Sequence, residues 1–141
     1  MKPPTPADFV LDARLAADTH PLARFQLCDL RLMDDSHFPW LVLVPRVAAA
    51  RDLIDLDRAQ QHLLSDEIDR ASRLLRDAFR PHKLNVAALG NVVAQLHVHV
   101  IARFEDDPAW PTPIWGKVET RPYTPEELVE CMALLDKLLR A

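Results

Sequence analysis

The sequence predicts an α+β fold in which an antiparallel sheet packs against helices. Strand-like segments come in two pairs, each pair joined by a short turn, and a long helical segment separates the pairs. A second helical segment ends the chain, so strands and helices do not alternate one by one as in folds with a parallel sheet. A chain of 141 residues buries about two-thirds of its unfolded surface when it folds. We therefore expect residues 1–141 to form a single domain.

The first strand pair is predicted over residues 25–33 and 40–44. Apolar and polar residues alternate along residues 25–33, which is typical of a half-buried strand. Residues 40–44 are all apolar and precede Pro45, which predicts a strand buried on both faces. The turn at residues 34–39 makes the two strands a hairpin. Residues 9–17 lie between prolines and suit either a short helix or an extended arm.

Two helices are predicted, over residues 58–79 and from Pro125 almost to the end of the chain. Apolar residues in the first recur at spacings of three and four, with charged residues on the other side. Asp57 is placed to cap this helix and Pro81 to end it. In the second helix Thr124 suits the cap position, followed by proline at the first helical position.

The second strand pair is predicted over residues 84–88 and about 92–104, with a Gly-Asn turn between them. Because side chains alternate across a strand, the second of these strands collects most of its polar side chains on one face. These side chains are Gln95, His97, His99 and Arg103. Residues two apart on a strand lie about 7 Å from each other, so one phosphate could touch several of these groups. A neutral imidazole can also attack phosphorus as a nucleophile.

The composition and charge of the chain limit the kinds of binding site that it can form. The chain holds only two glycines, which excludes phosphate cradles built from several neighbouring glycines. A net charge of −4 gives no positive field for nucleic acid. Cys28 and Cys131 follow no metal or redox spacing, which favours reduced thiols and the cytoplasm. No stretch has the length of a membrane span or the apolar core of a signal peptide, so we expect no membrane partner.

Two simpler readings of the polar strand face stay open at this point. The face could merely be exposed to solvent. Alternatively, His97 and His99 could share a zinc ion, but zinc needs at least a third protein ligand. The candidates for that ligand, none of which is selected by its spacing, are His20, His37, His62, His82 and Cys28.

Residues 95–101 resemble the signature of the histidine triad (HIT) superfamily, His-x-His-x-His-x-x with x apolar, except that Gln95 replaces the first histidine. Residues 84–86 with the Gly-Asn turn resemble the family's asparagine-bearing strand and Gly-Gln turn. Residues 41–46 resemble its apolar strand that ends in proline and a basic residue. The likeness covers roughly residues 25–115. It implies an antiparallel sheet of about five strands with one long helix and a C-terminal helix, usually in a homodimer.

The resemblance also implies roles for individual residues. His97 would attack the α-phosphate of a nucleotide conjugate, and His99 would bind phosphate. Asn85 aligns with an asparagine near the phosphate, Asn91 with a glutamine near the leaving group, and Asp34 with an acidic residue that binds ribose. The implied reaction forms a covalent nucleotidyl-histidine, which water hydrolyses to a nucleoside monophosphate without a metal or another cofactor.

Two departures from the family pattern bear on activity. Gln95 and Trp40 both stand where many members carry histidine, so two ionisable groups are missing. This predicts slow turnover or a changed preference for the leaving group, with Gln95 still able to hydrogen-bond phosphate. Arg103 could offset phosphate charge or simply point outward at the strand end. Trp110 and Trp115 could stack on a base, contribute to a dimer contact, or pack the proline-rich loop onto the sheet.

The sequence therefore predicts a hydrolase or nucleotidyl transferase acting on nucleoside phosphoramidates, dinucleoside polyphosphates or related conjugates. The expected partners are such a nucleotide and a second copy of the chain. The leading alternative is a nucleotide-binding module with little or no turnover. A metal-dependent hydrolase is the third possibility.

Overall fold

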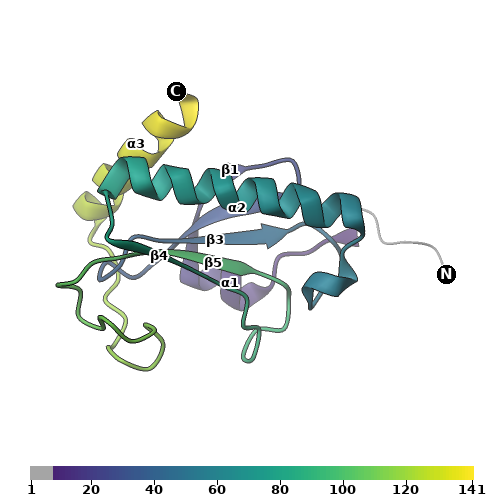
Figure 1. Cartoon of the computed structure of the whole chain (residues 1–141), viewed down its shortest axis with the longest axis horizontal. Coiled ribbons are helices and arrows are strands. Elements are labelled where there is room, and N and C mark those ends of the chain that lie inside the picture. The colour runs from purple at the N-terminus through teal and green to yellow at the C-terminus, as the bar shows by residue number, and fades with distance from the viewer. Residues whose placement is uncertain (1–7) are drawn as a thin grey trace.

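A computed structural model describes residues 8–141 and contains one five-stranded antiparallel sheet with strand order β1-β2-β3-β5-β4. Figure 1 shows α2 running along the length of this sheet. The elements are α1 (Ala13–Asp18), β1 (Thr19–Arg24), β2 (Cys28–Met33), β3 (Trp40–Pro45), the short 3-10 helix η2 (Leu53–Asp55), α2 (Arg58–Phe79), β4 (Lys83–Ala87), β5 (Val98–Arg103) and α3 (Pro125–Arg140). The predicted α+β class and antiparallel sheet are confirmed.

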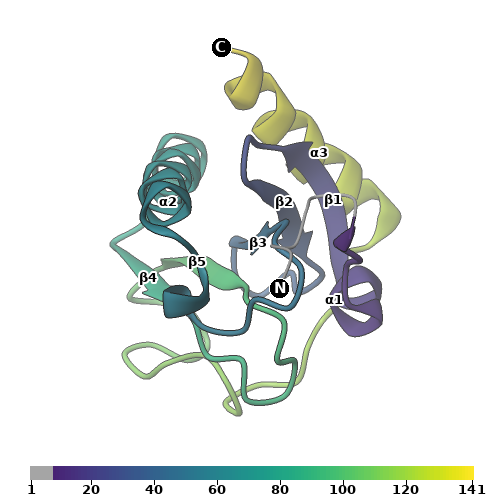
Figure 2. The same ribbon diagram turned by 90° about the vertical axis from the view of Figure 1, so that its right-hand side faces the viewer.

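The sheet is covered on both faces, but by different kinds of structure. Helices α2 and α3 lie on one face, where Leu75 and Leu135 join the core residues of the strands (Figure 2). On the other face, α1 and the segment between β5 and α3 cover a second apolar cluster that includes Trp40 and Ile101. Strand β3 lies between the two clusters and is buried along its whole length, as its continuous apolar run predicts.

Both predicted helices begin where their capping residues indicate. The Asp57 side chain accepts a hydrogen bond from the backbone N–H of Gln60, and α2 ends at Phe79. Arg80 then adopts a left-handed conformation with φ 50°. Pro81, which the sequence predicts as the end of the helix, follows it directly. The Thr124 side chain caps α3 in the same way. Strong local signals therefore fixed both boundaries.

The N-terminal part of the sheet differs from the sequence prediction. The segment that suited either helix or arm contains α1, and β1 follows it directly as an edge strand paired with β2. Pro21 fits β1 because an edge strand tolerates a missing N–H. Residues 25–27 belong to the turn between β1 and β2, so β2 begins at Cys28 rather than at residue 25.

The predicted strand over residues 92–104 is wrong at its beginning. Strand β4 pairs with β5 only as far as Ala87 opposite His99. Residues 88–97 form a loop, and the Leu96 N–H donates to the Ala50 carbonyl instead of to β4. Gln95 and His97 therefore precede β5, in a part of the chain whose backbone does not pair with β4. Within residues 8–141, no helix is long and apolar enough to cross a membrane.

Candidate active site

His97 and His99 lie together where the chain enters β5, on the face of the sheet opposite α2. Only 7% of His97 and 5% of His99 is exposed. The centroids of the two rings are 4.9 Å apart, with the rings nearly perpendicular at 76°. Buried imidazoles in contact do not form an ordinary solvent-exposed strand face, so that reading of the pattern is wrong.

The hydrogen bond of His97 determines which of its nitrogens can react. His97 Nδ1 lies 2.7 Å from the backbone carbonyl oxygen of Gln95. A carbonyl oxygen only accepts, so Nδ1 must carry the proton that it donates. In the neutral ring this leaves a lone pair on Nε2. His97 is therefore held in the tautomer that a nucleophile needs.

His99 is held in the opposite tautomer, because its Nδ1 meets a donor instead of an acceptor. Trp40 Nε1 lies 3.0 Å from His99 Nδ1, and an indole N–H can only donate. Nδ1 of His99 therefore accepts, and the proton of the neutral ring sits on Nε2. Burial, together with the smaller effect of the adjacent His97, lowers the pKa of His99 to about 4. His99 is thus a neutral N–H donor at pH 7.

Trp115 completes an aromatic wall around His99. Its ring centroid is 5.1 Å from that of His99 and 6.1 Å from that of Trp40, with both contacts edge-on. Trp115 remains 37% exposed, so its outer face is open to a ligand. Trp110 lies elsewhere, against His82 and the guanidinium of Arg103.

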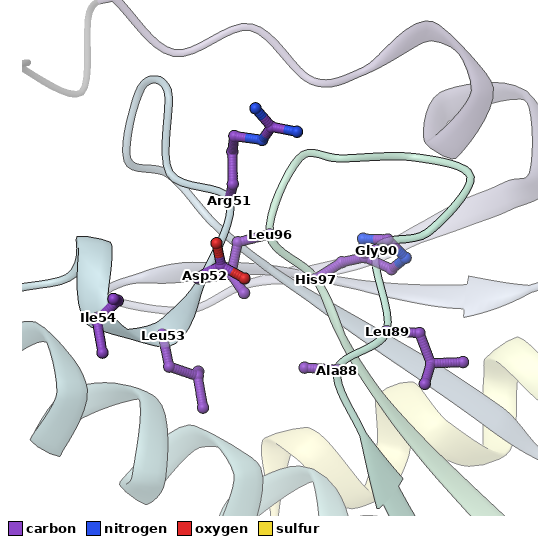
Figure 3. A pocket seen from close by; sticks show the side chains of 9 residues that line it. All are labelled: Arg51, Asp52, Leu53, Ile54, Ala88, Leu89, Gly90, Leu96 and His97. Atoms are coloured by element: carbon purple, nitrogen blue, oxygen red, sulfur yellow. The ribbon is translucent and has the colours of Figure 1, made fainter.

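A cleft of about 350 Å³ opens beside His97. Figure 3 shows Arg51 and Asp52, from the segment after β3, on one side of it and the segment after β4 on the other. Leu96 and His97 lie between the two. Of the two histidines, His97 lines this cleft.

Comparison with known proteins agrees with this geometry. The model of the HIT domain matches residues 14–106. The chain belongs to the HIT family. The crystal structure of a histidine triad protein from Marinobacter aquaeolei VT8 superimposes with a TM-score of 0.90 and 48% identity, over 94% of this chain and 96% of that one. A histidine triad protein from Bradyrhizobium japonicum gives 0.90 and 42%, over 92% and 97%.

A curated relative of this HIT domain is larger. An AP-4-A phosphorylase from Mycobacterium tuberculosis is 36% identical over an alignment of 84 positions, and the match covers 54% of this chain and 42% of that protein. The match thus spans less than half the length of the relative. The diadenosine triphosphate hydrolase of Plasmodium falciparum has the same fold, with a TM-score of 0.63 at 14% identity over 92% of this chain and 79% of that one.

The side chain of Gln95 holds the N-terminal segment of the described chain. Its carboxamide nitrogen donates to the Val10 carbonyl at 2.8 Å, and its oxygen accepts from the Asp12 N–H at 2.8 Å. The Asp12 side chain in turn caps α1 by accepting from the N–H groups of residues 14 and 15. The Gln95 side chain thus ties the beginning of α1 to the histidine loop.

Arg103 is buried in an ion pair. It is 1% exposed, and its Nε and one terminal nitrogen donate to Asp107 at 2.8 and 3.1 Å. The other terminal nitrogen donates to the Asn85 side-chain oxygen at 2.9 Å. Burial of Asp107 opposes its ionisation, but hydrogen bonds from Arg103 and three backbone N–H groups lower its pKa to about 2. Each nitrogen of the Arg103 guanidinium therefore already donates to a side chain within the protein.

Asp34 and Asn91 are the remaining predicted site residues. Asp34 follows β2 and accepts from the Tyr123 N–H at 3.0 Å. The register places Leu32 opposite Leu41 and Leu41 opposite Val100, so Asp34 lies level with the far half of β5. Asn91 is exposed in the loop before β5. The structure thus brings together His97, His99 and the backbone of Gln95, but not Asp34.

No metal cluster forms around the histidines in the part of the chain that the structure describes. Among residues 8–141, no three His, Cys, Asp or Glu side chains are grouped so that they could hold a metal ion. His20 and His37 face the carboxylates of Asp34 and Asp35 instead. Sequence reasoning missed the bond between Trp40 and His99.

Proposed function

We propose that this HIT domain hydrolyses nucleotide conjugates through a covalent intermediate on His97. A nucleotide-processing role follows from family membership and from relatives that are named for dinucleoside polyphosphate chemistry. The observation that carries the finer proposal is the tautomer pair. One imidazole presents a lone pair on Nε2, and the other, in contact with it, presents an N–H on Nε2.

In the first step, the Nε2 lone pair of His97 forms a bond to the α-phosphorus. The bond from phosphorus to the leaving group breaks, and its electron pair goes to the leaving group. The Nδ1 proton stays on the ring, where the Gln95 carbonyl stabilises the positive charge that develops. The Nε2 proton of His99 is donated in a hydrogen bond to a non-bridging phosphate oxygen, without leaving the ring.

In the second step, water attacks the same phosphorus. The bond between phosphorus and His97 Nε2 breaks, and its electron pair returns to the nitrogen. The proton lost by the water passes to solvent, and a nucleoside monophosphate is released. Trp115 is placed to contact the base or the leaving group across the exposed part of its ring.

A nucleotide-binding module is the second candidate function. It is favoured by one observation, namely that the side chains of Gln95 and Trp40 are committed to partners within the protein. In this reading the site binds phosphate through the His99 N–H, and the covalent step is too slow to matter.

Release of adenosine monophosphate from a dinucleoside polyphosphate separates the two functions. We expect the wild-type protein to release it and His97→Ala to lose that activity. His62→Ala removes an exposed histidine from α2, on the other face of the sheet, and serves as the matched control that keeps full activity. Tight nucleotide binding with no release would favour the module, and an active His97→Ala variant would refute the nucleophile.

We also propose a homodimer joined through β4. This strand is an edge of the sheet, its Val86 is 49% exposed, and Leu89 in the loop that follows is equally exposed. Light scattering at micromolar concentration should give twice the mass of the chain. A measured mass equal to that of one chain would contradict the proposed dimer. The cytoplasm remains the expected location.

A further inference from the structure

The nature of the leaving group decides whether a proton must be supplied in the first step. A phosphate group departs from an anhydride as a stable anion and needs no proton. An amine bound to phosphorus must be protonated before the bond breaks, because an amide anion is far too basic to leave. A site that serves phosphoramidates well therefore holds a general acid with a pKa near neutrality.

Among residues 8–141, the side chains that contact the two histidines do not include such an acid. His99 is the nearest N–H, but its ring is neutral, and a neutral imidazole gives up its last proton only to a very strong base. Trp40 and Trp115, which pack on His99, do not ionise. Gln95 does not ionise either, and both ends of its carboxamide are bonded to the N-terminal segment.

The cleft beside His97 adds one charged side chain of each sign. Its charged lining residues are Arg51 and Asp52. Both lie in the exposed segment after β3. The Arg51 guanidinium stays protonated at any physiological pH, so it attracts anionic leaving groups without donating a proton.

Trp40 keeps His99 neutral, with its proton on Nε2. The Trp40 N–H occupies the His99 nitrogen that would otherwise take up a proton, and the two tryptophans exclude water from the ring. Protonation of His99 would set an N–H of the imidazolium against the N–H of the indole. Trp40 therefore determines the tautomer of His99, and its ring contributes to the burial that keeps His99 neutral.

We infer that Trp40 is a specificity-determining residue. It restricts the site to phosphoric anhydrides of nucleotides, such as dinucleoside polyphosphates, and disfavours nucleoside phosphoramidates. This inference rests on the proposed function, since it concerns the leaving group in the first step. With an anhydride, His97 Nε2 bonds to the α-phosphorus, the P–O bond breaks, and the leaving phosphate takes the electron pair and no proton. With an amide, the P–N bond stays intact until a proton reaches nitrogen.

The test compares kcat/KM for diadenosine tetraphosphate and for adenosine 5′-phosphoramidate at pH 7. We expect the wild type to prefer the anhydride by about a hundredfold, the range of a missing general acid. Trp40→His supplies an ionisable ring at the same place, and it should raise kcat for the phosphoramidate at least about tenfold relative to the anhydride. Trp40→Phe removes the N–H without adding an acid, and we expect no gain of this kind.

The outcomes separate this inference from the proposed function. Equal cleavage of both substrates by the wild type would overturn the inference and leave the covalent hydrolysis standing. No release of adenosine monophosphate from either substrate would overturn the proposed function and the inference with it. A further measurement does not depend on any variant folding: nitrogen-15 NMR of the wild-type protein at pH 7 should show His99 protonated at Nε2 alone. A proton on Nδ1 would overturn the role given to Trp40.

Discussion

Replacing His99 by asparagine should remove an acid-sensitive part of the stability. Asparagine keeps an oxygen that can accept from the Trp40 N–H, but it does not titrate. Burial lowers the pKa of His99 from 6.5 to about 4 in the folded protein, whereas the unfolded chain keeps the ordinary value. The unfolded state therefore binds a proton first as the pH falls, and folding becomes less favourable.

The pH window and the magnitude follow from these two values. The contribution of His99 to stability is fully present above pH 6.5, falls as the pH drops from 6.5 toward 4, and stays constant below 4. One pH unit within this window is worth about 1.4 kcal/mol. Between pH 7 and pH 4.5 the wild type should therefore lose about 2 kcal/mol more than His99→Asn.

Urea unfolding of both proteins at several pH values measures this difference. Other carboxylates and histidines titrate in both proteins, so their effects cancel in the comparison. We expect the two stability curves to converge as the pH falls. A difference in free energy of unfolding that stays the same from pH 7 to pH 4.5 would refute the claim that His99 is buried as a neutral ring.

Three further substitutions test other contacts of the fold and the site. Glu67 is buried and accepts from the N–H groups of residues 27 and 28 through its two oxygens. Glu67→Gln leaves one N–H unpaired and should lower the free energy of unfolding in urea by about 1 to 3 kcal/mol. An unchanged midpoint would contradict this role of Glu67. Arg103→Met leaves the buried Asp107 carboxylate uncompensated and should cost about 3 to 5 kcal/mol, whereas adding Asp107→Asn should recover part of the loss; no recovery would argue against the pair. Trp115→Ala admits water to His99, so NMR titration should find its pKa raised from about 4 toward 6.5, and an unmoved pKa would show that Trp115 does not cause the burial.

The elements that sequence reasoning located well carry strong local signals. Asp57 and Thr124 each mark a helix start, and both caps form as predicted. Strand β1 was missed because Pro21 and its neighbours lack the alternation of a strand, and an edge strand depends on its partner more than on its own pattern. The beginning of β5 was misplaced because the apolar residues from Val92 onward resemble a strand but lie in the loop before it.

The site was predictable in its residues but not in its contacts. The pattern around His97 and His99 was visible in the sequence, and the structure places both in one buried pair. The register of β3 and β5 puts Trp40 opposite Ile101, on the diagonal from His99, and only this pairing reveals the bond that fixes the tautomer. Arg103 likewise meets Asp107 only after the loop beyond β5 has folded back.

The most direct test of the account is detection of the covalent intermediate. The protein is mixed with diadenosine tetraphosphate, denatured at alkaline pH within one turnover to preserve the phosphorus–nitrogen bond, digested and analysed by mass spectrometry. We predict an adenylyl group on the peptide that contains residues 95–103, located by fragmentation at His97 and missing from His97→Ala. Release of adenosine monophosphate with no adduct at any quench time, or with an adduct on His99, would contradict the assignment of His97 as the nucleophile.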